Sequence, residues 1–124
     1  MKVLALDYGS ARTGVAVSDP TGTLARPLTV VQHVTGPEGW KRLLEVIRAE
    51  EPAKVVVGLP LTLKGEHGLQ AAETDAFVTL LRAELDVPVD LYDERFTSIL
   101  ADGDDARAAA HLLATYLEWQ SAAR

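Results

Sequence analysis

The sequence has no cysteine, which excludes disulfide bonds, thiolate zinc sites and cysteine nucleophiles. It also lacks any apolar run close to the roughly 20 residues that span a bilayer. The first apolar run ends at Asp7, which does not fit a secretory signal peptide. We therefore expect a cytoplasmic protein without contact to a membrane.

An excess of positive charge is lacking as well, since the formal net charge is -6. This argues against a protein that binds nucleic acid of any sequence through a broad basic surface. It does not exclude a nuclease, because carboxylates gathered to hold metal ions add to the negative count. With 124 residues, 48% of them hydrophobic, the chain is expected to form one domain over residues 1–124.

The apolar pattern predicts an α/β fold in the order βββαβαβα. Strands are expected at residues 3–6, 14–18, 24–34, 54–58 and 87–92. Helices are expected at residues 37–50 and 69–85, and from residue 104 or 105 to residue 122. The three opening strands should be antiparallel and the later two parallel, giving a mixed five-stranded sheet flanked by helices. The second helix is expected to gather the following apolar residues on one side: Ala72, Ala76, Phe77, Leu80 and Leu81.

Acidic residues stand where strands end. Asp7 follows the first strand, Glu94 follows the last strand, and Asp104 and Asp105 open the final helix. If the first and last strands are neighbours, Asp7 and Glu94 converge at one end of the sheet, where ligands collect in such folds. Close carboxylates repel one another unless protons or cations intervene, and hard divalent cations prefer oxygen ligands. The pattern therefore favours a divalent-metal site that serves phosphodiester cleavage.

Each acidic residue also has a simpler explanation. Asp7 begins an Asp-Tyr-Gly sequence that suits a hairpin turn. Asp104 or Asp105 suits the N-cap of the last helix. Glu94 suits a weak surface pair with Arg95. The combination of these residues, rather than any one of them, favours the metal site.

Four segments, in order along the chain, resemble the motifs of one known family. They are residues 6–20 (LDYGSARTGVAVSDP), 56–61 (VVGLPL), 93–98 (DERFTS) and 105–117 (DARAAAHLLATYL). This set is similar to the YqgF/RuvX family of Holliday-junction resolvases, whose members are also described as pre-16S rRNA nucleases. The resemblance covers nearly the whole chain.

The resemblance implies a ribonuclease H-like fold and a catalytic, metal-binding triad of Asp7, Glu94 and Asp105. It implies Mg²⁺ or Mn²⁺ as cofactor and nucleic acid as substrate, either an rRNA precursor processed at its 5′ end or branched DNA. The chain departs from the family in one place, since only residues 99–104 separate the third motif from the fourth. Asp104 is therefore an alternative third ligand, and a non-catalytic binding or assembly factor is an alternative function.

Basic and aromatic residues near these motifs are candidates for nucleic-acid contacts. The basic candidates for contacts to the nucleic-acid backbone are Arg12, Lys64, His67 and Arg95. Tyr8 and Tyr92 either stack on a base or pack inside the protein. A nucleotide-phosphate binder of the actin and sugar-kinase type also opens with a strand and an Asp-x-Gly turn, but this chain is too short for its two lobes. The protein is expected to be a monomer or a homodimer.

Overall fold

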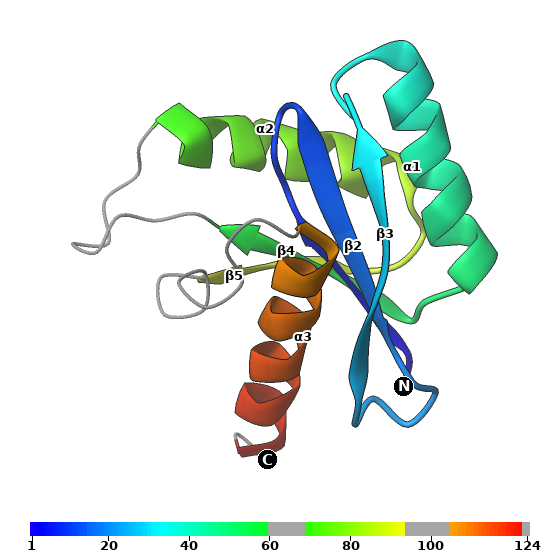
Figure 1. The fold of residues 1–124 in the computed structure, drawn as a ribbon, viewed down its shortest axis with the longest axis vertical. Helices are drawn as coiled ribbons and strands as arrows, with labels where there is room; N and C mark the ends of the chain where they lie inside the picture. The colour runs from blue at the N-terminus through cyan, green and yellow to red at the C-terminus, as the bar shows by residue number, and fades with distance from the viewer. Residues whose placement is uncertain (60–68, 94–104, 123–124) are drawn as a thin grey trace.

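A computed structural model describes residues 1–59, 69–93 and 105–122 of the chain (Figure 1). Its elements are β1 (Val3–Asp7), β2 (Arg12–Ser18), β3 (Ala25–Gln32), α1 (Pro37–Glu50), β4 (Lys54–Leu59), α2 (Leu69–Glu84), β5 (Val89–Asp93) and α3 (Asp105–Ala122). This order confirms the predicted βββαβαβα pattern. No helix in these ranges is both long and apolar enough to cross a membrane.

The five strands form one mixed sheet in the order β3-β2-β1-β4-β5. β1 pairs antiparallel with β2, and β2 pairs antiparallel with β3. β4 pairs parallel with β1 on one side and with β5 on the other. The mixed sheet confirms the predicted fold class.

The first and last strands are not neighbours, so the condition under which Asp7 and Glu94 would directly converge is not met. β4 occupies the place beside β1, so β5 joins the sheet outside it as an edge strand. Because strands in a sheet lie about 4.8 Å apart, the backbones of β1 and β5 are separated by about 10 Å. Acidic residues at the ends of these two strands must therefore reach across β4 to meet.

Both faces of the sheet are covered, and the residues of β1 alternate between them. Leu4 and Leu6 belong to the core beneath α1 and α2. Val3 and Ala5 belong to the core beneath α3. In Figure 1, α3 lies in front of the sheet and α2 behind it. Each residue of β1 can therefore be assigned to one face.

Most element boundaries have a local cause. α1 begins at Pro37, whose missing N–H costs nothing in the first turn, and is followed by Glu51 in the left-handed conformation (φ 49°). β3 is shorter than predicted because His33 also has a positive φ of 52°. β5 starts at Val89 rather than at residue 87, directly after Pro88, which cannot donate a ladder hydrogen bond.

The buried side of α2 differs from the predicted one. Phe77 and Leu81 are buried as expected, together with Thr74 and Val78. Ala72, Ala76 and Leu80 are exposed instead, and 58% of Leu80 is accessible to solvent. Because the packed side of the helix is rotated from the predicted one, α2 leaves an apolar strip beside α1 uncovered.

Candidate functional site

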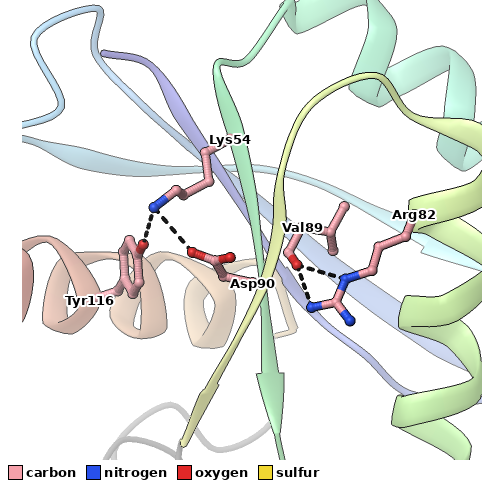
Figure 2. A network of polar contacts seen from close by, with 5 residues as sticks. All are labelled: Lys54, Arg82, Val89, Asp90 and Tyr116. Carbon is pink, nitrogen blue, oxygen red and sulfur yellow. Dashed lines mark hydrogen bonds and ion pairs between the residues drawn. The ribbon is translucent and has the colours of Figure 1, made fainter.

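The end of β1, at Asp7, and the start of α3, at Asp105, lie at the same end of the sheet. The direction of α3 follows from a contact at the other end. Lys54, the first residue of β4, donates a hydrogen bond of 2.9 Å from its Nζ to the hydroxyl of Tyr116 in α3 (Figure 2). Asp105 lies eleven residues before Tyr116, or about 16 Å along the helix. α3 therefore runs antiparallel to β4 and β1, and it begins near the end of the sheet where Asp7 lies.

A side chain also links β5 to α2 by hydrogen bonds. The guanidinium of Arg82 donates two hydrogen bonds, of 3.0 and 2.7 Å, to the carbonyl oxygen of Val89 (Figure 2). Val89 begins β5, which runs parallel to β4 and so ends at the same side as Asp7. The carboxyl ends of β1, β4 and β5 thus define the candidate site.

Asp7 is the last residue of β1, and strand alternation places it on the face covered by α3. Its side chain is partly exposed. On one side, Asp7 pairs in register with Gly14 of β2. On the other side, Leu6 pairs with Val57 of β4, so the next residue of β4, Gly58, lies at the level of Asp7. A glycine therefore flanks Asp7 on each neighbouring strand, and neither contributes a side chain that would crowd the carboxylate.

The other two predicted ligands have no described side chains. Glu94 lies outside the described residues, as does the alternative ligand Asp104. Asp105 is the first residue of α3, but only its place in the helix is described. In the part of the chain that the structure describes, no three acidic or histidine side chains gather as a metal site would require. The triad therefore stays a prediction.

Arg12 is the one predicted nucleic-acid contact whose side chain is described. It is exposed and begins β2, at the same end of the sheet as Asp7. Lys64, His67 and Arg95 lie outside the described residues. The structure also brings His33 to this end, because its backbone N–H donates to the carbonyl oxygen of Ala11 at 3.0 Å. No sequence pattern predicts this neighbour, because His33 lies far from Ala11 along the chain.

Tyr8 is buried, and Tyr92 is partly buried against other aromatic rings. The ring of Tyr8 is stacked on that of Phe77 with 4.5 Å between centroids, and only 6% of Tyr8 is exposed. Burial, and secondarily the carboxylate of Glu73, raises the pKa of the Tyr8 hydroxyl. Tyr92 packs edge-on against Tyr116 at 5.4 Å. Of the two alternatives for these residues, the structure supports packing.

Comparison with known proteins gives a family and a fold. The family model described as "RuvX: Holliday junction resolvase" matches residues 1–119. A protein of Roseiflexus sp. (strain RS-1) is 46% identical over 82% of this chain and 72% of its own length. Proteins of Maridesulfovibrio salexigens (36% identical, 94% of this chain and 98% of that protein) and Rubrobacter xylanophilus (43%, 94% and 92%) are also similar. All three bear the name "Putative pre-16S rRNA nuclease".

Not every position of these alignments has a counterpart in this chain. The one with the Maridesulfovibrio protein has 132 positions but covers 94% of this chain, which is about 117 residues, so about 15 positions have no counterpart here. The Roseiflexus alignment, over 101 residues and 82% of the chain, has almost no such positions. About 15 positions of the Maridesulfovibrio alignment therefore have no residue of this chain.

Solved structures with the same architecture confirm the fold. Thermus thermophilus RuvC superposes with a TM-score of 0.62 at 20% identity, covering 98% of this chain and 97% of that one. The fowlpox virus Holliday junction resolvase superposes with a TM-score of 0.57 at 13% identity, covering 96% and 99%. These similarities confirm the predicted ribonuclease H-like arrangement of strands and helices.

Proposed function

The chain belongs to the RuvX family of Holliday junction resolvases, and from this premise we propose that it is a metal-dependent nuclease. It hydrolyses phosphodiester bonds in structured nucleic acid. The observation that carries the proposal is the position of Asp7: a partly exposed carboxylate at the end of β1, facing the helix that Asp105 begins.

Three carboxylates hold the cation in this proposal: Asp7, Glu94 and Asp105. Oxygen donors of this kind suit Mg²⁺ or Mn²⁺. Gly14 and Gly58, at the level of Asp7 on the two neighbouring strands, place no side chain beside this carboxylate, which suits the approach of a cation and a phosphate group in this proposal. When bound, the cation supplies Lewis-acid stabilisation of the charge that develops on the phosphate.

The protein binds the nucleic-acid backbone at the same end of the sheet. Arg12 is exposed there, and a guanidinium binds a phosphate with two parallel hydrogen bonds. Lys64, His67 and Arg95 are the further backbone contacts in this proposal. Because the net charge is -6, these contacts are confined to the site rather than spread over the surface. Binding should therefore be local and depend on the shape of the substrate.

Removal of the Asp7 charge tests the proposal. We expect Asp7→Asn to lose Mg²⁺-dependent cleavage while its thermal melting curve stays at the wild-type position. Asp86→Asn is the matched control, since Asp86 is an exposed aspartate after the far end of α2. Cleavage by Asp7→Asn at the wild-type rate would contradict the proposed role of Asp7, and a wild-type protein inactive on every substrate below would contradict the nuclease.

The substrate is the finer part of the proposal. The names of the relatives favour the 5′ end of pre-16S rRNA, and the description of the family favours a Holliday junction. A 5′-labelled pre-16S leader and a four-way DNA junction should be compared at equal enzyme concentration. Faster cleavage of the leader supports rRNA processing, and faster cleavage of the junction supports the resolvase alternative.

The short interval of residues 99–104, together with the 15 or so alignment positions that have no residue of this chain, favours a second candidate function, a non-catalytic binding or assembly factor. A chain with a displaced third ligand would bind nucleic acid without cleaving it. Calorimetric titration with Mn²⁺ separates the candidates. Mn²⁺ binding that is lost in Asp105→Asn but kept in Asp104→Asn supports the nuclease, and absence of Mn²⁺ binding supports the assembly factor.

A further inference from the structure

A groove runs between α1 and α2 on the face of the sheet opposite Asp7. Its volume is about 620 Å³, within the range of roughly 300–1,000 Å³ that is usual for small-molecule sites. Its lining includes aromatic and polar side chains: Tyr8, Ser10, Thr35, Trp40, Glu73 and Phe77. The uncovered strip of α2, with Ala76 and Leu80, forms one wall.

The aromatic residues of the groove form one packed group. Phe77 stacks on Tyr8 and meets Trp40 edge-on, with 6.0 Å between centroids and an angle of 82°. Trp40 is only partly buried, so part of its ring is accessible from the groove. A flat, apolar ligand therefore has a preformed aromatic surface against which to pack.

The polar groups of the groove are mainly hydrogen-bond acceptors or hydroxyls. Glu73 is exposed and lies close enough to Tyr8 to affect its hydroxyl electrostatically. Among the described residues, the Tyr8 hydroxyl makes no hydrogen bond. Because no fully buried polar side-chain atom in this part of the chain lacks a partner, this hydroxyl is not fully buried. The groove thus offers a carboxylate and a hydroxyl beside an aromatic surface. A carboxylate there repels a phosphate but accepts hydrogen bonds from a neutral ring with N–H groups.

The groove reaches the same end of the sheet as the proposed nuclease site. Tyr8 follows Asp7 directly, so their Cα atoms are about 3.8 Å apart while their side chains face opposite sides of the sheet. A nucleic-acid strand bound at this end can therefore place a phosphate on the Asp7 side and a neighbouring base on the Tyr8 side.

On these grounds, and resting on the proposed function, we propose that the groove binds one unstacked guanine of the nucleic-acid substrate. Guanine presents two adjacent N–H donors, on N1 and N2, that match the two oxygens of the Glu73 carboxylate. Its ring packs against the exposed part of Trp40. Enzymes that take a base out of a helix read it in this way, by hydrogen bonds to its edge and contacts to its face.

Trp40 allows the proposal to be tested without any measurement of cleavage. The chain has two tryptophans, and Trp119→Phe leaves Trp40 as the only one. Its fluorescence should be titrated in EDTA with the hexanucleotides UUGUUU, UUAUUU and UUUUUU. We expect UUGUUU to quench the emission and to bind about tenfold more tightly than the other two. EDTA prevents metal-dependent cleavage, so a failure of the nuclease proposal does not affect this result.

Two further variants in the Trp119→Phe background locate the site. Ala76→Phe places a ring in the groove and should abolish quenching, whereas Ala72→Phe is the matched control on an exposed position of the same helix outside the groove. Glu73→Gln should remove the preference for guanine. Equal binding by the Ala76→Phe and control variants, equal affinity for all three RNAs, or emission that changes with protein concentration instead of RNA would overturn the proposal. The last outcome would indicate that a second copy of the chain occupies the groove.

Discussion

Lys54 links α3 to the sheet by a hydrogen bond, and removal of its ammonium group should measurably destabilise the protein. Its ammonium donates to the Tyr116 hydroxyl at 2.9 Å and lies 3.1 Å from a carboxylate oxygen of Asp90. Only 17% of the Lys54 side chain is exposed, against 44% for Asp90. The hydrogen bond should therefore contribute about 1–2 kcal/mol, and the half-exposed ion pair about 0.5 kcal/mol or less.

Lys54→Met keeps most of the apolar stem and removes both interactions. We expect the free energy of unfolding to fall by about 2 kcal/mol, measured by urea denaturation with circular dichroism. Lys41→Met is the control, because Lys41 is exposed on α1 and should change stability by no more than about 0.5 kcal/mol. A double-mutant cycle with Tyr116→Phe should give a coupling energy of about 1 kcal/mol.

The same contact has a signature at high pH. The hydrogen bond to Tyr116 is the main cause that raises the pKa of Lys54 above its ordinary value. Stabilisation from a raised lysine pKa is complete below the unfolded-state pKa, about 10.4, and is lost as the pH rises through the folded-state pKa. The difference between wild type and Lys54→Met should stay constant from pH 7 to 9 and shrink above about pH 10.5. Equal urea midpoints at pH 7, or a coupling energy of zero, would refute the reasoning.

Three further predictions concern the Asp19 turn, the core beneath α3 and the surroundings of Asp7. Hydrogen bonds from the Thr21 hydroxyl and from the N–H groups of Thr23 and Leu24 lower the pKa of Asp19 to about 2. The ionised Asp19 therefore stabilises the folded state at a pH above its unfolded-state pKa near 4, and this stabilisation is lost as the pH falls towards 2. Asp19→Asn should therefore be less stable than wild type at pH 5 but not at pH 2 in acid titrations followed by circular dichroism; an equal difference at both would contradict this. Leu113→Ala, at a fully buried position, should lower the free energy of unfolding by about 2–5 kcal/mol in urea, and a loss below 1 kcal/mol would mean that the core beneath α3 is loosely packed. Gly14→Ala adds a methyl group beside Asp7 and should weaken Mn²⁺ binding about tenfold in calorimetry. Unchanged affinity would show that the bound cation does not depend on a glycine at this position.

Local signals explain how much of the fold was predictable. α1 was predicted with the bounds that the structure has, because Pro37 starts it, its apolar residues recur at helical spacing, and Pro52 follows its end. The end of β3 was predicted two residues too late, since nothing in the sequence signals the positive φ of His33. Errors of this kind arise where one residue adopts a conformation that its type rarely shows.

Spatial neighbours were harder to predict than elements. The sequence does not reveal that β4 lies between β1 and β5, because strand order depends on how helices pack across the whole sheet. The rotation of α2 depends in the same way on contacts with Tyr8 and Trp40, which lie far away along the chain. The groove beside α2 could therefore not be predicted, although every residue that lines it is visible in the sequence.

The candidate site was predicted by residue type and motif order. Asp7 was predicted to follow the first strand, and it is the last residue of β1; its position on the face that α3 covers comes from the structure. The two glycines beside Asp7 could not be predicted, because Gly14 and Gly58 come to the level of Asp7 through strand pairing that a single sequence does not show. The roles of Glu94 and Asp105 stay predictions that the substitutions above will decide.

The direction of α3 bears on how this chain tolerates a shorter sequence than its relatives. β5 ends and α3 begins at the same end of the sheet, on residues Asp93 and Asp105. The eleven residues between them can reach at most about 36–40 Å when fully extended, which exceeds the width of the sheet at that end. Because the end of β5 and the start of α3 lie at one end of the sheet, a short connection can join them without moving any strand or helix.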